Sequence, residues 1–333
     1  MVPRLRIEEL EKQTLSPKAA LACESRGRDR EEEPCSFRTD FQRDRDRVLH
    51  SKAFRRLRHK TQVFLSPVGD HYRTRLTHTL EVSQIARTIA RCLQLNEDLT
   101  EAIALAHDLG HTPFGHAGER ALDHCMPDGF RHYEQSVRVV ELLEKDGHGL
   151  NLTWEVRDGI LNHTTGEQAS TLEGRIVRIA DKVAYINHDI DDAIRAGVLT
   201  EEELPPDVTA VLGNGRNARF DTMIGSVVDN SIDDITMSPE VWGAFDRLHT
   251  FMFEKVYYNP IAKSEEKKVD EFIGRMFFYF VERPDQLPAE FRPICEREGA
   301  MRAACDYIAG MTDTFAIQKY NDLFVPKGWP IGR

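Results

Sequence analysis

Apolar residues recur at intervals of three and four along most of this chain, and that helical period limits its possible folds more than any other feature. Helices are predicted at Thr74–Leu93, Asp98–Leu109, Tyr133–Lys145, Trp154–Asn162, Glu173–Arg195, Pro239–Val256 and Glu265–Val281. The alternating pattern of a half-buried β-strand is almost absent. The apolar stripes of these helices must therefore pack against one another, and the chain is predicted to be all-α.

Size and composition argue against several classes of protein. The chain has 333 residues, of which 41% are hydrophobic and 30% charged, so it can bury a sizeable core and disorder is not expected. No segment approaches the roughly 18 consecutive apolar residues of a membrane span, and the N-terminus lacks the apolar stretch of a secretory signal. The six cysteines are scattered, as in a reduced protein. These features predict a cytoplasmic protein that does not cross a membrane.

The helical segments suggest three regions along the chain. We predict a loosely packed N-terminal arm over residues 1–35, a catalytic core over residues 36–200, and a C-terminal helical region over residues 201–333 that packs on the core. Thr200–Arg219 contains Pro-Pro and Gly-Asn-Gly, which are turn signals. This stretch is the best candidate for a seam between subdomains or a surface loop.

Charge is distributed unevenly. The net charge of −11 argues weakly against a broad nucleic-acid surface. Between Ser36 and Arg75, however, eleven lysines and arginines stand against four aspartates. A basic segment in an acidic protein suggests a specific site for a polyanion. A solvated face whose charges pair with one another explains the same pattern equally well.

Three places in the sequence offer metal-ligand chemistry. His78 shares a helical face with Val82 and Ile85, so it points inward and needs a polar partner. A lone inward histidine is more often a core residue than a ligand. His107-Asp108 ends an apolar helix, where an imidazole and a carboxylate together form half of a divalent-metal site. Any single His-Asp pair is by itself a weak signal.

Asp181 provides the third element. It shares one arc of its helix with Lys182, Tyr185 and Asp189, opposite an aliphatic stripe. That arc is either solvated or the wall of a polar cleft, and the period cannot distinguish the two. The four candidate ligands are His78, His107, Asp108 and Asp181. Two imidazoles and two carboxylates suit Mn, Fe, Co, Ni or Zn better than Mg alone, and leave positions for water and a phosphate oxygen.

This order of ligands resembles the HD superfamily of metal phosphohydrolases. Five longer blocks narrow the resemblance to the bacterial dGTPase-like dNTP triphosphohydrolases. They are Phe54–Phe64, Gly69–Arg91, Glu101–Glu119, Phe130–Glu141 and Ile179–Ala193. The similarity runs from about Leu15 to the last helices. Five such blocks in order are far more specific than the His-Asp pair alone.

The resemblance implies cleavage between the α-phosphate and the 5′ oxygen of a deoxynucleoside triphosphate, with release of intact tripolyphosphate. His116 matches the family histidine that protonates the leaving oxygen, and Glu119 is expected to orient it and raise its pKa. His132 matches a supporting histidine, and His111 is expected to bind phosphate or a second ion. Without the resemblance, His132 and Glu119 would be taken for ordinary surface residues.

The resemblance also implies substrate contacts. Arg75 and Lys182 are expected to clamp phosphate oxygens. Tyr185 and Asp189 match residues that pack against the sugar and accept its 3′ hydroxyl, and Gln62 matches another contact on that side. A tyrosine beneath the 2′ carbon would exclude ribonucleotides by steric clash. The alternative for both cations is an ordinary solvated surface position.

Some questions remain open at the level of sequence. The chain has His-Tyr-Glu-Gln-Ser at 132–136 where several relatives have His-Asn-x-Gln-Ser, which leaves the neighbouring contact and the base preference undetermined. Nothing in the motifs selects guanine. One alternative is another HD activity, such as a deoxynucleoside monophosphate phosphatase or a cyclic-nucleotide or alarmone phosphodiesterase. Another is a nucleotide-sensing or single-stranded nucleic-acid-binding oligomer. The resemblance further implies a homo-oligomer, such as a hexamer, with dNTP effectors at its interfaces.

Overall fold

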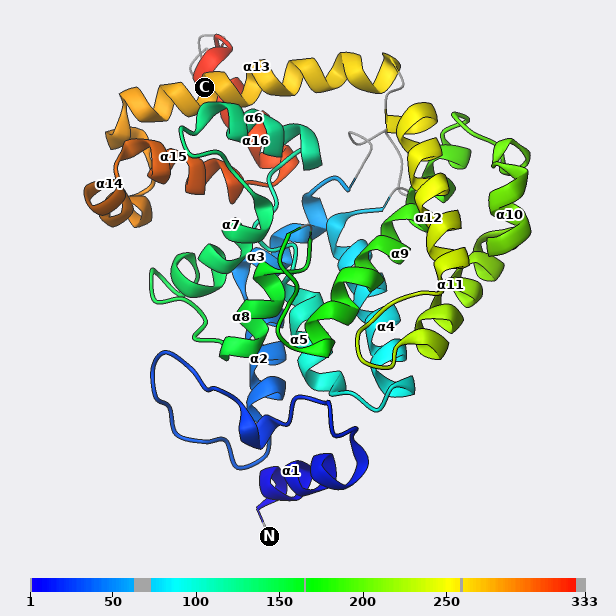
Figure 1. The fold of residues 1–333 in the computed structure, drawn as a ribbon. Helices are drawn as coiled ribbons and strands as arrows, with labels where there is room; N and C mark the ends of the chain where they lie inside the picture. Colours follow the sequence, from blue (N-terminus) through cyan, green and yellow to red (C-terminus); the bar gives the residue numbers. More distant parts are fainter. Residues whose placement is uncertain (1, 63–72, 165, 258–259, 328–333) are drawn as a thin grey trace, which may run out of the picture.

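The computed structural model describes residues 2–62, 73–164, 166–257 and 260–327, without the side chains of 260–266. Within these ranges the chain forms sixteen α-helices, and its one β-type contact is an isolated bridge between Thr61 and Thr74. The prediction of an all-α fold is therefore confirmed (Figure 1). None of the helices in the described part is long and apolar enough to cross a membrane.

The helices follow one another with short connections. They are α1 (Pro3–Thr14), α2 (Asp40–Leu49), α3 (Lys52–Arg56), α4 (Arg75–Cys92), α5 (Glu97–Ala106), α6 (Gly115–Cys125), α7 (His132–Arg138), α8 (Trp154–Leu161), α9 (Leu172–Arg195), α10 (Pro206–Leu212), α11 (Arg216–Asn230), α12 (Pro239–Met252), α13 (Pro260–Glu282), α14 (Arg292–Glu298), α15 (Ala300–Ala309) and α16 (Asp313–Phe324). One π-helical turn, Val139–Leu143, continues α7, and another, Phe253–Tyr257, continues α12.

Side-chain caps explain where the three central helices begin. Thr74 accepts a hydrogen bond from the Thr77 amide at the start of α4. Asn96 caps α5, and Thr171 caps α9, by accepting from the backbone two or three residues further on. These caps satisfy amides that a helix leaves without an internal partner. The predicted helices therefore start within one or two residues of the observed ones.

The prediction of a loop over Thr200–Arg219 was wrong, because most of this stretch is helical. It contains α10 and the beginning of α11. Pro206 occupies the first turn of α10, where a missing amide hydrogen costs nothing. Gly213 and Gly215 have φ values of 86° and 82° and allow the sharp connection between the two helices. The turn signals were real, but they mark the ends of helices.

Hydrophobic packing divides the molecule into two clusters. The larger cluster joins α2, α4, α5, α8 and α9 with α10–α12. The smaller cluster joins α6 with α13, α15 and α16 at the end of the molecule that carries the C-terminus (Figure 1). Packing thus groups residues 206–256 with the central helices and α6 with the C-terminal ones. The domain boundaries proposed from the sequence stay a prediction.

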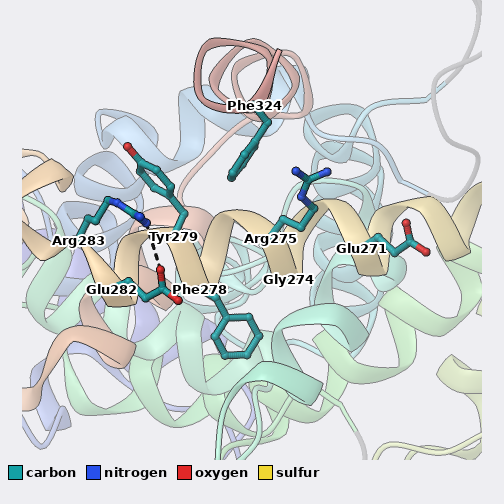
Figure 2. Close-up of a pocket in the computed structure, with 8 residues that line it drawn as sticks. All are labelled: Glu271, Gly274, Arg275, Phe278, Tyr279, Glu282, Arg283 and Phe324. Atoms are coloured by element: carbon teal, nitrogen blue, oxygen red, sulfur yellow. Dashed lines mark hydrogen bonds and ion pairs between the residues drawn. The ribbon is translucent and has the colours of Figure 1, made fainter. Parts of the chain in front are cut away.

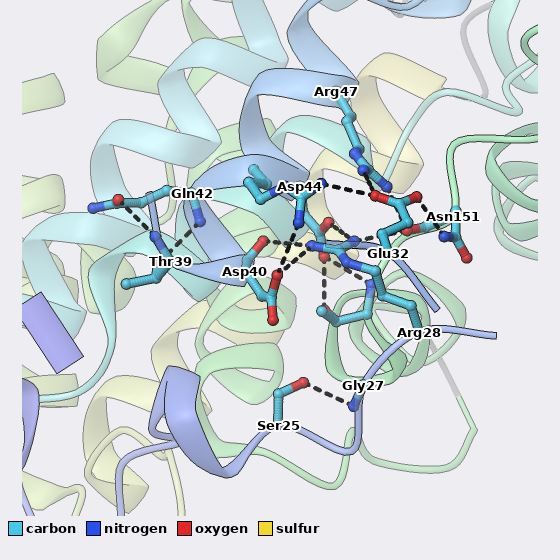
Figure 3. A network of polar contacts seen from close by, with 12 residues as sticks. Ser25, Gly27, Arg28, Glu32, Thr39, Asp40, Gln42, Asp44, Arg47 and Asn151 are labelled. Carbon is cyan, nitrogen blue, oxygen red and sulfur yellow. Dashed lines mark hydrogen bonds and ion pairs between the residues drawn. The ribbon is translucent and has the colours of Figure 1, made fainter. Parts of the chain in front are cut away.

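The N-terminal arm is packed more firmly than expected. The Arg28 side chain is 6% exposed and pairs with the fully buried Asp44 of α2. The same guanidinium donates to the Asn151 carbonyl at 2.7 Å, and Asp44 also accepts from the amide and hydroxyl of Thr153, both at 2.7 Å. Figure 3 shows this network, with Glu32 joining Arg47 beside it. Buried polar groups must find partners, so these contacts hold the arm against the core.

A surface groove of about 590 Å³ runs along α13. Figure 2 shows Arg275 and Tyr279 of α13 pointing toward Phe324 of α16, whereas Phe278 points away from them. The guanidinium carbon of Arg275 lies 4.8 Å from the centre of the Phe324 ring. None of the predicted site residues lines this groove.

Candidate metal and phosphohydrolase site

The four predicted metal ligands converge from three helices. His78 comes from α4, His107 and Asp108 follow the end of α5, and Asp181 comes from α9. The His78 Nε2 atom lies 2.9 Å from Asp181 Oδ1. The His107 Nε2 atom lies 3.6 Å from Asp108 Oδ2 and 3.9 Å from Asp181 Oδ1. The structure thus brings together residues that are up to 103 positions apart.

The packing of α9 decides how the Asp181 arc is used. Helix α9 lies against both α4 and α5, so Asp181 faces the histidines instead of bulk solvent. His78 is 1% exposed, as expected from its apolar helical face. The carboxylate of Asp181 keeps about a quarter of its surface accessible, at 23%. The arc of α9 is therefore the wall of a polar cleft.

A hydrogen bond fixes the orientation of His107. Its Nδ1 atom donates to the Ala104 carbonyl at 2.7 Å, which leaves the Nε2 lone pair facing the two carboxylates. This Nε2 atom is buried and has no hydrogen-bond partner within the described residues. A buried, unpaired nitrogen is costly unless a ligand satisfies it. The donor set and this orphaned atom fit a divalent metal ion.

The segment after α5 is anchored from α7. The Ser136 hydroxyl lies 2.6 Å from the His107 carbonyl and accepts from the Gly110 amide at 2.9 Å. A Cβ atom at Gly110 would lie 2.2 Å from the Ser136 nitrogen, so only glycine permits this approach. The glycine of the His-Asp-Leu-Gly block thus serves to hold the ligand pair in place.

Electrostatics keep both acidic ligands charged. Burial by itself would raise the pKa of Asp108, but the Arg75 guanidinium, 2.7 Å away, brings it well below its usual range. Burial also acts to raise the pKa of Asp181, and the hydrogen bond from His78 lowers it further than burial raises it. Two ionised carboxylates beside two imidazoles attract a cation strongly.

The remaining predicted catalytic residues form a second cluster next to the ligands. The rings of His111 and His132 stack with centroids 4.6 Å apart, and the His116 ring lies 5.4 Å from His111. Glu119 accepts hydrogen bonds from both the amide and the Nδ1 atom of His132, each at 2.9 Å. Glu119 therefore orients His132, not His116 as expected from the sequence.

This pairing separates the protonation behaviour of the two histidines. For His132, burial acts to lower the pKa, but the contact with Glu119 raises it above the ordinary value. The enclosing protein and the Arg75 cation lower the pKa of His116, although its ring is open to solvent at the cleft. The expectation that Glu119 raises the pKa of His116 was wrong. Its carboxylate acts mainly on the imidazole that it contacts.

The predicted substrate contacts surround the same cleft. Arg75 also donates to the Gln62 carbonyl at 3.3 Å, and the Gln62 side-chain oxygen is buried without a partner among the described atoms. The Lys182 ammonium lies 5.2 Å above the Trp242 ring, on the outer side of Asp181. Tyr185 packs against His249, with ring centroids 6.0 Å apart, and Asp189 is buried one turn further along α9.

Comparisons with known proteins agree with this geometry. The HD domain model matches residues 75–186, and the phosphohydrolase-associated domain model matches residues 235–322. A deoxyguanosinetriphosphate triphosphohydrolase-like protein of Caldanaerobacter subterraneus subsp. tengcongensis is 62% identical over 97% of this chain and 96% of its own length. Another of that name from Clostridium perfringens is 49% identical over 97% and 98%. The chain belongs to the deoxyguanosinetriphosphate triphosphohydrolase-like family.

As a member of this family with an HD domain, the protein is a metal-dependent phosphohydrolase. A crystal structure of a hypothetical protein from Aquifex aeolicus shares the fold. Its TM-score is 0.51 at 20% sequence identity, over 85% of this chain and 68% of the other. At that identity the likeness concerns the fold alone.

Sequence reasoning missed three residues at the site of this family member. His163 is 1% exposed, and its ring lies 4.9 Å from that of His107 and 5.4 Å from that of His132. Tyr257 donates a hydrogen bond from its hydroxyl to Asp189. His188 packs against His78. His163 directly follows a predicted helix, a signal that could have been used, but nothing local indicated the partners of the other two.

An aromatic row extends from Tyr257 along one face of α12. Neighbouring rings along this row are separated by 4.7 to 6.2 Å. The row consists of Trp242, Phe245, His249, Phe253 and Tyr257. It forms an apolar wall that starts beside Asp189 and continues away from the candidate metal ligands.

Replacing Asp189 with asparagine is expected to stabilise the protein at alkaline pH. Burial raises the pKa of this carboxyl from 3.8 to about 7, so the folded state favours its neutral form. That contribution to stability is present below about pH 4 and is lost as the pH rises through 7. The free energy of unfolding of Asp189→Asn should therefore exceed that of wild type by an amount that grows with pH, up to about 4 kcal/mol.

Urea unfolding at pH 4.5 and pH 8 measures this effect, and the exposed Asp229→Asn is the matched control. A stability gain of the same size at both pH values would contradict the assignment.

Proposed function

We propose that this protein hydrolyses deoxynucleoside triphosphates, dGTP among them, to a deoxynucleoside and inorganic tripolyphosphate. The observation that carries the proposal is the buried His107 Nε2 atom, which faces two ionised carboxylates beside Arg75. The names of the relatives support this substrate class. We further propose that the family's substrate contacts apply here residue by residue.

The candidate metal ligands are His78, His107, Asp108 and Asp181. A divalent ion held there, such as Mn, Mg, Fe, Co, Ni or Zn, would polarise the α-phosphate and lower the pKa of a bound water. Arg75 lies beside the ligands and can turn from Asp108 toward a phosphate oxygen. Lys182, next to Asp181, adds a second cation, and His111 adds a neutral imidazole at the floor of the cleft.

We assign the general acid to His116. Its ring is open to the cleft, and its pKa is low only while no polyanion lies beside it. A bound triphosphate would raise that pKa and protonate the ring, which could then donate to the leaving 5′ oxygen. The pair of His132 and Glu119 would support this step by holding a second positive charge next to His111.

We assign the sugar pocket to Tyr185, Asp189 and Gln62, with Tyr257 as an additional member. The carboxylate of Asp189 accepts from Tyr257 and would accept from a 3′ hydroxyl in the same way. The Tyr185 ring would leave no room for a ribose 2′ hydroxyl. Comparable turnover of GTP and dGTP by the wild-type protein would refute this selectivity.

Replacing His116 with alanine is expected to lower kcat by about 10²-fold or more, because a general acid contributes about 10²–10⁴-fold. His132→Ala should lose less and should respond differently to pH, because it removes a supporting charge. The measurement is the steady-state rate of tripolyphosphate release between pH 5 and 9. If His132→Ala loses 10²-fold while His116→Ala loses less than tenfold, the role of general acid passes to His132.

The overall reaction is tested by incubating the metal-supplemented protein with each dNTP, singly and in mixtures, and separating the products by ion exchange. One-step release of tripolyphosphate is expected. Release of monophosphate or pyrophosphate alone would favour another HD phosphohydrolase. Activity confined to mixtures would reveal a dNTP effector site, which stays a prediction together with the homo-oligomer.

The basic segment is less available to nucleic acid than its composition suggests. Several of its arginines pair with acids: Arg38 with Asp46, Arg43 and Arg47 with Glu32, and Arg45 with Asp98 and Glu101. This pattern favours a salt-bridged face. Salt-dependent binding of single-stranded DNA that survives His107→Ala would support the binding alternative instead.

A further inference from the structure

We propose that His188 and Glu81 position the metal ligand His78 through its Nδ1 nitrogen. This inference rests on the metal centre of the proposed function but not on the choice of substrate. His188 lies on α9, seven residues after Asp181, and Glu81 lies on α4, three residues after His78. Each residue therefore follows a candidate ligand on the same helix, at a spacing that places both on one face.

The geometry places His188 directly behind His78. Both rings are 1% exposed. Their centroids are 5.8 Å apart and their planes are perpendicular, so the edge of one ring faces the other. On its other side, the His188 Nε2 atom lies 3.0 Å from Glu81 Oε2. His78, His188 and Glu81 thus form a continuous row that leads away from the candidate metal ligands.

The protons of this row can be placed by simple chemistry. A neutral imidazole that binds a cation through Nε2 carries its hydrogen on Nδ1, and that hydrogen needs an acceptor. The Nδ1 atom of His78 is buried and has no hydrogen-bond partner within the described residues. The same holds for the Nδ1 atom of His188. With its own hydrogen on Nε2, toward Glu81, His188 presents an Nδ1 lone pair that can accept from His78.

Glu81 is itself fixed by charge, which is what sets the tautomer of His188. Its carboxylate lies 3.3 Å from the Arg73 guanidinium and 3.4 Å from that of Arg216 at the start of α11. Two arginines keep Glu81 ionised, so it acts as an acceptor toward His188. The row therefore connects the ligand His78 to α11.

The other histidine ligand has a different arrangement. His107 donates its Nδ1 hydrogen to a carbonyl of its own helix. His78 lies early in α4, where the backbone carbonyls behind it already accept helix hydrogen bonds, as Thr74 O does from the His78 amide at 3.1 Å. A partner for its ring must therefore come from another helix. His188 is the buried imidazole that α9 supplies at that position.

Metal titration of purified, metal-free variants tests this inference without relying on activity. His188→Phe keeps a ring of similar size but removes the acceptor, and Mn²⁺ calorimetry should show a dissociation constant about 10- to 100-fold higher than wild type. His188→Gln keeps an acceptor and a donor and should recover most of that loss. The exposed His124→Gln controls for the removal of any histidine. Thermal melts of the metal-free forms establish that they fold.

The outcomes separate the possible failures. Wild-type affinity in a folded His188→Phe, or an equal loss in the Phe and Gln variants, would overturn the inference while leaving the metal centre intact. If His188→Phe does not fold, Glu81→Gln takes its place, and an unchanged dissociation constant would overturn the inference. A wild-type protein that binds no Mn²⁺ would overturn the metal centre and this inference together.

Discussion

Replacing His107 with alanine is expected to lower kcat/KM for dNTP hydrolysis by about 10⁴-fold or more. The buried Nε2 atom of this residue faces both carboxylate ligands, and no other described side chain offers a nitrogen in that position. Without it, a divalent ion would keep one imidazole from His78 and two carboxylates. Both the polarisation of the phosphate and the activation of water depend on that ion, so the two contributions are lost together.

Tripolyphosphate release, together with metal content after dialysis, measures the effect of His107→Ala. Asp181→Asn provides a second variant of nearly unchanged volume, which should lose both activity and metal. The exposed His124→Ala is the control and should retain wild-type values. Activity within tenfold of wild type in both ligand variants would show that the metal centre is not where these residues converge.

Replacing Asp44 with alanine is expected to lower the free energy of unfolding by about 3–5 kcal/mol, since removal of one partner leaves a buried charge uncompensated. Asp44 is fully buried and holds Arg28, whose side chain is 6% exposed, as well as the amide and hydroxyl of Thr153. The change would therefore release the N-terminal arm from α2. The specific activity of the folded fraction should change little, because neither residue belongs to the candidate site.

A surface pair gives the matched control for this prediction. Arg38 and Asp46 are 2.7 Å apart, with side chains that are 48% and 25% exposed. Arg38→Gln should cost less than about 1 kcal/mol, because solvent screens the pair. Chemical unfolding of both variants measures the difference. Equal losses for Asp44→Ala and Arg38→Gln would mean that the arm contributes no more than an ordinary surface contact.

Local signals in the sequence were enough to predict the helices of the core. The caps at Thr74, Asn96 and Thr171 are encoded by single residues, and the apolar period identifies the buried face of each helix. The turn residues between 200 and 219 show the limit of this reasoning. Proline and glycine mark where the backbone changes direction, but they do not say how much helix fits between two such points.

The sequence by itself determined the all-α fold and the four candidate ligands, because helical period, cap residues and donor chemistry are properties of short segments. Only the tertiary structure decided that the Asp181 arc lines a cleft, that Glu119 holds His132, and that His188 stands behind His78. The physical reason is that a polar helical face looks the same whether it meets water or another helix. The partner of each of these groups lies on a different segment of the chain, so only the packing of α4, α5 and α9 reveals it.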